Sequence, residues 1–325
     1  MDEQYKHTHL FFKEDGHSYT DSNGNSYLSC TTFVHKYAQE FNKDYWLKKK
    51  AAELGKSIAD VEADWIAITN ESCERGTKRH NYLEDSIKDV SKFAKAVKYY
   101  TDLKTGQMIT VADIPYLKIK ALDINEFKER TEYKYPKIYE VFDFYIKKGY
   151  SIYSEIGVFL IDYLLSGTID ILCIRDSDFV ILDWKTNKDG LHFTSGYYKK
   201  DKSCKPAQLT NNWVHKNEYL KAPLNNLPSC NGSLYTMQLN MYAVMVNKVL
   251  GIPCVGLGLC HIGSSFVLNK YGMPLRNEQG MYTIDESKDE IVNWYRIQSK
   301  FKEAELLLKD RAIEIGKIDS QLKLF

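Results

Sequence analysis

The sequence lacks several features that would place a protein in a class at once. No apolar run approaches the roughly 20 residues needed to span a bilayer, and the amino-terminal segment Met1–Gln4 is too polar for a signal peptide. The net charge of +1 provides no overall attraction to nucleic acid, so any phosphate-binding surface has to be a local patch. These absences predict a cytoplasmic protein with no membrane partner.

Cysteine is scarce and scattered. The seven cysteines are odd in number and include no Cys-x-x-Cys pair, which predicts reduced thiols rather than a disulfide framework. Aromatic residues are plentiful instead, with 24 tyrosines and 14 phenylalanines. Such rings serve either as packing or as platforms for stacked bases, and both interpretations are open for each of them.

A length of 325 residues with 44% hydrophobic content allows a large core, in one elaborated domain or two. We predict a single domain over residues 1–325. Its parts would be an N-terminal hairpin with helices (1–70), a core (71–270) with an insertion (187–232), and a C-terminal helix (285–315).

The stretch from Gly167 to Thr186 organises the chain. It contains two short runs rich in β-branched and aromatic residues, 169–174 and 179–182, which favour strands. The compact polar sequence 175–178 lies between them. This pattern predicts a β-hairpin.

The register of this hairpin brings charged residues together. If the loop has four residues, Ile174 pairs with Phe179, and Asp170 then lies opposite Asp183. Opposed residues hold their Cβ atoms roughly 4.5–5.5 Å apart, so these carboxylates repel unless a cation lies between them. Lys185 projects from the same face as Asp183, because strand side chains alternate. Two carboxylates and an amine predict a metal site, which a register slip of one residue would remove.

The other elements follow from apolar periodicity and from capping residues. No element is assigned over 101–135. The elements that we expect are a hairpin (9–29), a short helix from Thr31 or Thr32 to Tyr37, a helix over 44–54, a helix that starts at a Ser57–Asp60 capping arrangement, a further helix around His80, a helix over 136–149, a strand over 150–160, a long irregular stretch (187–232), a helix capped by Ser233 that ends near Gly251, a strand over 255–262 and a long amphipathic helix over 285–315. Their order implies a mixed sheet flanked by helices.

Gly76, His80 and Glu84 fall four residues apart and share one face of a predicted helix. A glycine inside a helix costs about 1 kcal/mol relative to alanine, so we expect another part of the chain to approach Gly76 closely. His80 is either a partnered polar residue of this helix or a ligand.

Four motifs occur in the order typical of one enzyme family. In chain order they are Gly76-x-x-x-His80-x-x-x-Glu84, Gly167-x-Ile-Asp170, Asp183-x-Lys185 and Gln238-Leu-x-x-Tyr242. Together they resemble the RecB-type branch of the PD-(D/E)XK nuclease superfamily. The first part of the chain is also similar to phage exonucleases and to the mitochondrial genome maintenance exonuclease. The Asp/Glu-x-Lys triplet alone is weak evidence, because it occurs at four other places in the chain.

The resemblance implies an α/β fold with a restriction-endonuclease-like core, a mixed central sheet flanked by helices, and an N-terminal, mainly helical extension. It also implies a bound Mg²⁺ or Mn²⁺ ion. The implied metal ligands are His80, Asp170, Asp183 and the backbone carbonyl of Trp184. Iron–sulfur members of this branch carry four cysteines with a Cys-x-x-Cys pair; the pair is missing here, so we predict no cluster.

The resemblance also assigns roles around the metal. Lys185 would hold the attacking water and stabilise charge that develops on the phosphate. Gln238 and Tyr242 would face the site, where they support Lys185 or contact the backbone of the nucleic acid. Glu84 and Glu155 are candidates for residues that support the ligands, and a structural role is equally open for both.

The stretch 187–232 bears on the substrate. It interleaves lysines with aromatic rings, a combination that neutralises phosphates and stacks on bases without reading sequence. The predicted nucleic-acid-binding residues are Tyr197, Tyr198, Lys199, Lys200 and Trp213. We therefore expect a metal-dependent DNA exonuclease that acts on single-stranded or frayed ends in replication, recombination or repair. A restriction-type or structure-specific endonuclease and a catalytically silent nucleic-acid-binding module are the alternatives.

Overall fold

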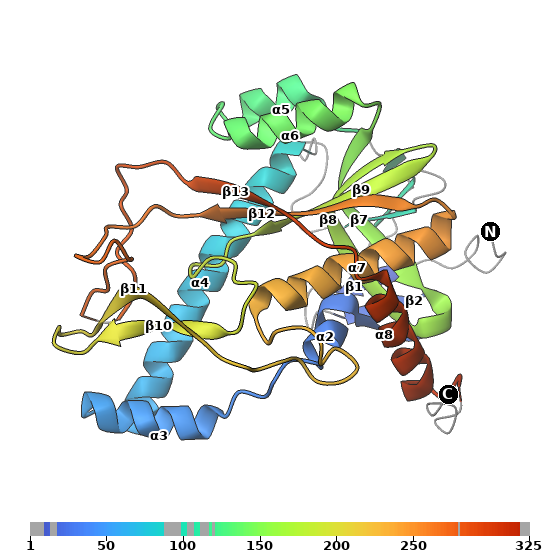
Figure 1. Ribbon diagram of the computed structural model, residues 1–325. Coiled ribbons are helices and arrows are strands. Elements are labelled where there is room, and N and C mark those ends of the chain that lie inside the picture. Colours follow the sequence, from blue (N-terminus) through green and yellow to red (C-terminus); the bar gives the residue numbers. More distant parts are fainter. Residues whose placement is uncertain are drawn as a thin grey trace.

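An eight-stranded mixed sheet forms the centre of the protein in the computed structural model (Figure 1), which describes residues 10–13, 18–87, 99–102, 107–110, 117–118, 121–278 and 280–318. The strand order is β1-β2-β3-β8-β9-β12-β13, and β7 also pairs with β8. The strands are β1 (Leu10–Lys13), β2 (Ser18–Asp21), β3 (Ser26–Ser29), β7 (Ser151–Leu160), β8 (Leu165–Arg175), β9 (Asp178–Lys185), β12 (Cys254–Gly263) and β13 (Ile291–Arg296). The predicted mixed α/β architecture is confirmed.

Helices cover both faces of this sheet. The main core lies between the sheet and helices α2, α7 and α8, and a second core lies between the opposite face and the end of α4 with α5 and α6. Among the described helices, none is both long enough and apolar enough to cross a bilayer. The helices are α2 (Cys30–His35), α3 (Lys43–Leu54), α4 (Ile58–Ile87), α5 (Ile124–Arg130), α6 (Pro136–Lys147), α7 (Asn231–Leu250) and α8 (Phe301–Glu314).

The central hairpin has the predicted register. Ile174 pairs with Phe179, and the antiparallel ladder between β8 and β9 continues to Ile171 and Leu182. Asp170 and Asp183 occupy the next positions, just beyond the last pair. On its other side β9 pairs in parallel with β12, so the strand is buried on both edges.

The sheet divides at the end of this hairpin. One edge of β8 has two partners. It pairs with β9 as far as Ile171, and with β3 at Leu165 and Ser166. Residues 167–170 lie between these two ladders. Asp170 therefore sits at a fork where two neighbouring strands diverge, and this fork leaves room for a site.

Local signals correctly predicted several helix ends. Helix α3 begins after Asn42, whose side chain accepts from the Tyr45 N–H, and it ends at Gly55 with a positive φ of 64°. Ser57 and Asp60 form the expected reciprocal capping bonds. The N-cap of α2 is Ser29 rather than Thr31 or Thr32, because the Ser29 hydroxyl accepts from the Thr32 N–H.

Three of the predictions about elements were wrong in extent or type. The two helices expected between Ser57 and Glu84 are one helix, α4. Helix α7 begins at Asn231 after Cys230, so Ser233 is not its cap. The stretch 187–232 is not irregular throughout, since it contains a hairpin of β10 (Gly196–Asp201) and β11 (Gln208–His215).

The predicted C-terminal helix over 285–315 is also wrong. Its first part is the edge strand β13, in which Trp294 pairs with Cys260 of β12, and only the second part is helix α8. The β-branched and aromatic residues of β13 (Ile291, Val292, Trp294 and Tyr295) are of the types that strands favour. Trp294 packs against Trp184, with ring centroids 6.1 Å apart, so tertiary contacts reinforce the strand.

The region 101–135 carries no sequence-based prediction of an element. Its described elements are α5 and a small three-stranded sheet of β4 (Tyr99–Asp102), β5 (Gln107–Thr110) and β6 (Leu117–Lys118).

Two of the sequence motifs meet in the main core. A Cβ atom at Gly167 would lie 2.6 Å from Cε1 of Tyr242, so only glycine leaves room for this ring. Tyr242 is 3% exposed. The Gly167 and Tyr242 motifs are thus linked by packing between β8 and α7.

Gly167→Ala is expected to lower the free energy of unfolding by about 1–3 kcal/mol, the usual cost of overpacking a core. Urea denaturation of the two proteins measures the difference. The double variant Gly167→Ala/Tyr242→Leu should regain part of the loss, because the smaller side chain makes room for the methyl group. A single variant as stable as the original protein would contradict this packing.

Candidate metal centre

Three side chains from three elements converge at the fork in the sheet. His80 of α4, Glu155 of β7 and Asp170 of β8 each offer a ligand atom, and these atoms lie within 4.8 Å of one another. Nε2 of His80 is 3.2 Å from Oδ2 of Asp170 and 3.7 Å from Oε1 of Glu155. One imidazole and two carboxylates form a donor set that can hold a divalent cation.

Glu155 reaches this group through an unusual backbone conformation. Its φ is 55°, a left-handed value in the middle of a strand. The pairs Ser154–Ile171 and Ile156–Ile169 flank it. Tyr153 and Ile156 contact the same core although an odd spacing of three residues would place them on opposite faces of a regular strand, so the alternation of the strand changes at Glu155. Such strain costs on the order of 1–3 kcal/mol and persists where the surroundings enforce it, often at functional sites. The sequence suggested only a supporting role for Glu155, because a left-handed φ leaves no signal in a glutamate.

Asp183 and Lys185 form the second part of the site. Their side chains make a buried ion pair, on the face of β9 that packs toward α7. The predicted shared face of these residues is therefore confirmed. Asp170 lies beside them and accepts a hydrogen bond of 2.9 Å from the Trp184 N–H. Of the predicted ligands, the structure thus brings His80 and Asp170 together, adds Glu155, and directs Asp183 toward Lys185.

Burial and mutual charge set the protonation of these groups. Burial and the charge of Asp170 raise the pKa of Asp183 to about 7, although Lys185 opposes the shift. Burial raises the pKa of Asp170. The charges of His80 and Lys185 and the hydrogen bond from the Trp184 N–H outweigh burial, so the pKa of Asp170 is lowered. Asp170 is therefore the carboxylate that remains ionised.

The two basic groups are held in their charged forms. Burial lowers the pKa of His80, but the carboxylates around it outweigh burial and raise this pKa to about 10. Burial likewise lowers the pKa of Lys185, and Asp183 and Asp170 more than compensate. The His80 imidazolium thus supplies positive charge between Asp170 and Glu155, and a cation that binds there has to displace its proton.

Helix α4 is held close to the sheet around His80. A Cβ atom at Gly76 would lie 2.8 Å from Oγ1 of Thr186, so the close approach predicted at Gly76 is present. Arg79 donates from Nη1 to the Ile262 carbonyl over 3.2 Å and also pairs with Glu290. Sequence reasoning missed Arg79, although its position next to His80 in the motif was the available signal.

Glu84 lies on the far side of the imidazole. Its Oε2 is 3.9 Å from Nδ1 of His80, while Nε2 faces Asp170. A carboxylate behind a ligating histidine commonly orients the ring. This placement fits the supporting role considered for Glu84.

Tyr235 of α7 contacts Lys185. The Lys185 ammonium lies 4.7 Å from the centroid of the Tyr235 ring, and the Tyr235 hydroxyl exchanges hydrogen bonds with the Asn187 side chain. Gln238 and Tyr242 lie deeper, in the main core, and Gln238 donates to the Tyr242 hydroxyl over 3.4 Å. Tyr235, Gln238 and Tyr242 follow one another at spacings of three and four residues, so they share one face of α7. A role of Gln238 and Tyr242 at the site stays a prediction.

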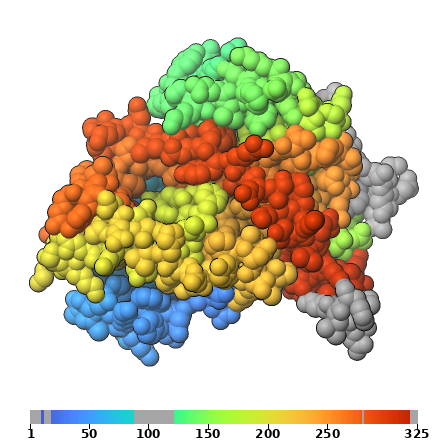
Figure 2. Space-filling model, in the orientation of Figure 1, coloured from blue at the N-terminus to red at the C-terminus, as the bar shows by residue number. Residues whose placement is uncertain are grey.

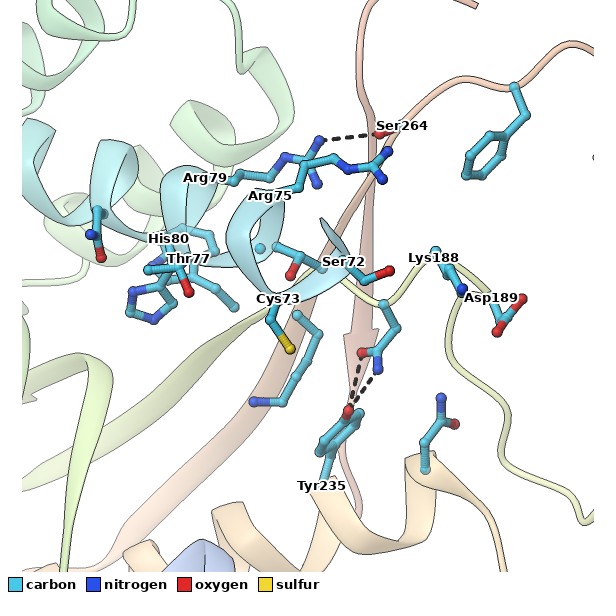
Figure 3. A pocket seen from close by; sticks show the side chains of 18 residues that line it. Ser72, Cys73, Arg75, Thr77, Arg79, His80, Lys188, Asp189, Tyr235 and Ser264 are labelled. Atoms are coloured by element: carbon cyan, nitrogen blue, oxygen red, sulfur yellow. Dashed lines mark hydrogen bonds between the residues drawn. The ribbon is translucent and has the colours of Figure 1, made fainter. Parts of the chain in front are cut away.

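An open pocket of about 650 Å³ adjoins the centre (Figure 3). Side chains of α4 form one side of it, and Lys188 and Asp189 of the loop after β9 form the other. His80, Trp184 and Lys185 also line the pocket, so it opens directly onto the candidate metal centre.

The predicted nucleic-acid-binding residues lie elsewhere. Tyr197, Tyr198, Lys199 and Lys200 are on β10 and Trp213 is on β11, and none of them lines this pocket. The His192 ring stacks on Trp213 with centroids 4.8 Å apart, and Tyr198 meets the Trp213 ring edge-on. Of the three predicted base-stacking residues, Tyr197, Tyr198 and Trp213, only Tyr197 is exposed.

No protein-family model, curated protein or solved structure matches this chain. Its function therefore has to be argued from the chemistry of the site.

Proposed function

We propose that this protein is a metal-dependent DNA exonuclease with a RecB-like, PD-(D/E)XK core. The observation that carries the proposal is the group of His80, Glu155 and Asp170 beside a partly buried, charged lysine, Lys185. Further support comes from the order of elements, in which the antiparallel strands β7, β8 and β9 precede α7 and the parallel strand β12.

The donor set fits a hard divalent cation, with the imidazole shifting the preference from Mg²⁺ toward Mn²⁺. Such an ion supplies a polarised phosphoryl oxygen and a bound water of lowered pKa. Asp170 and Glu155 would hold it from neighbouring strands, and His80 would do so after loss of its proton. Asp183 and the Trp184 carbonyl, both at the end of β9, complete the proposed ligand set.

Lys185 contributes charge rather than proton abstraction. Because its pKa is raised by Asp183 and Asp170, the amine stays protonated at neutral pH and cannot serve as the base. A fixed ammonium at this position stabilises negative charge that develops on the phosphate. Tyr235 holds this ammonium against its ring and so positions it.

Digestion of end-labelled DNA tests the proposal. We expect the protein with Mn²⁺ to shorten a linear single-stranded oligonucleotide progressively, to leave the circularised oligonucleotide intact, and to lose activity in EDTA. Cleavage that persists in EDTA would contradict the metal mechanism. Cleavage of the circle would support an endonuclease, and DNA binding without cleavage would support a silent binding module.

A further inference from the structure

The pocket beside the metal centre has the size and position of a substrate path. A cavity of about 650 Å³ falls within the roughly 300–1,000 Å³ in which proteins enclose small ligands. It can therefore accept a short stretch of one strand. A duplex would need room for its second strand as well. Its lining contains hydrogen-bond donors that suit phosphate oxygens, among them Thr77, Asn81 and Ser264.

Two cations of the pocket lining are available for a ligand. Arg75 of α4 is paired with Glu71 over 2.7 Å, in a surface pair whose side chains are 32% and 53% exposed. Such a pair contributes little and can exchange for a phosphate. Lys188 is exposed and has no ion-pair partner among the residues that the structure describes. In Figure 3 the two side chains come from opposite sides of the pocket.

The other cations of the lining are already engaged. Arg79 is bound to the Ile262 carbonyl, to Glu290 and to Ser264, so its guanidinium is part of the attachment of α4. Lys185 is paired with Asp183. Arg75 and Lys188 therefore remain as the groups that can take phosphate beyond the catalytic centre.

The hairpin β10–β11 packs against a neighbouring segment of the chain and does not line the pocket. This segment is 264–290, and Figure 2 shows the two side by side, in yellow and orange. Gln208 and Arg276 exchange two hydrogen bonds, and Asn269 donates to the Leu209 carbonyl over 2.8 Å. We call residues 196–215 together with 264–290 the side wall.

The side wall supports the pocket rather than lining it with lysines. The Tyr282 hydroxyl donates to Asp189, and Phe266 lies in the pocket lining. Lys200 is exposed at the surface, and partial desolvation with the nearby charges of Arg276 and Lys50 lowers its pKa. The hairpin thus holds one side of the pocket in place, while its own lysines lie outside.

We propose that a single DNA strand runs from the metal centre through this pocket, with its phosphates held between Arg75 and Lys188. This inference rests on the proposed nuclease function and adds the path of the substrate. Arg75 supplies a planar, forked donor that suits phosphate geometry, and Lys188 supplies a point charge opposite it. The lysines of β10 are outside this path.

Equilibrium binding without cleavage tests the path. Fluorescence anisotropy of a labelled oligothymidylate is measured with the full chain in EDTA, across a salt series. Arg75→Ala/Lys188→Ala should weaken binding at least about 10-fold at moderate salt, and it should reduce the log–log salt slope by about 1.4, or about 0.7 for each lost contact. Lys147→Ala/Lys302→Ala, which removes two exposed lysines outside the pocket, is the matched control for charge.

Two results would overturn the inference. One is unchanged affinity and salt slope in Arg75→Ala/Lys188→Ala, or a loss no larger than in the control. The other is a larger loss in Lys199→Ala/Lys200→Ala than in the pocket variant, which would return the path to β10. Metal-dependent cleavage by the original protein in either case would leave the proposed function standing, whereas absence of both cleavage and DNA binding would reject both proposals.

Discussion

Asp170→Asn is expected to abolish metal-dependent cleavage and to weaken Mn²⁺ binding by more than the roughly 10- to 100-fold that loss of an outer partner costs. Asp170 contacts His80 at 3.2 Å, and its lowered pKa keeps it ionised. An asparagine oxygen can still accept from the Trp184 N–H, so the hairpin should survive. Calorimetric titration with Mn²⁺ and digestion of a labelled strand measure the two effects.

The matched control is Asp176→Asn, which makes the same change at an exposed position in the turn of the same hairpin. It should leave both metal binding and cleavage as they are. Asp170→Asn with unchanged Mn²⁺ affinity, in a protein whose melting temperature is preserved, would show that Asp170 is not a ligand.

Lys185→Met is expected to remove activity while metal binding persists. Loss of a fixed charge that stabilises a developing anion typically lowers the rate about 100- to 1,000-fold. Lys185 is not a ligand in this proposal, and removal of its positive charge should if anything favour a bound cation. Single-turnover cleavage and Mn²⁺ titration of the same preparation separate the two effects. Equal loss of metal binding and activity would instead make Lys185 part of the metal-binding structure.

The same variant should have a pH-dependent stability. Without Lys185, Asp183 loses the ammonium beside it and keeps only the smaller effect of His80, so burial and Asp170 raise further a pKa that is already about 7 in the intact site. A raised folded-state pKa means that the folded form prefers the proton, so stability is retained below the unfolded pKa of about 3.9. It falls as the pH rises through the folded pKa. Thermal melts should therefore show a small deficit at about pH 5 and a larger one at about pH 8, and a deficit independent of pH would contradict this protonation.

In the absence of a metal, the site has a consistent electrostatic arrangement. Protonated His80 lies between Asp170 and Glu155, and protonated Lys185 lies against Asp183. Each cation offsets the repulsion among carboxylates that three adjacent strands bring together. Metal binding would take over the role of the imidazolium, and the proton on His80 is then the group released.

Local patterns determined much of this protein from the sequence alone. The hairpin register that places Asp170 next to Asp183 follows from loop length and from strand alternation. The close approach at Gly76 follows from the cost of glycine in a helix, and the space there is indeed taken by Thr186. These predictions succeeded because the responsible interactions lie within a few residues of one another or leave a compositional mark.

Tertiary structure decided which side chains meet. Glu155 joins His80 because a left-handed backbone turns it, and β13 is a strand because the open edge of β12 pairs with it. Tyr235 contacts Lys185, and Tyr242, two turns further along the same face of α7, lies against Gly167. Likewise, the lysines of β10 are not part of the pocket lining. Each of these outcomes depends on contacts between residues far apart in the chain, whose free energies no local pattern of the sequence records.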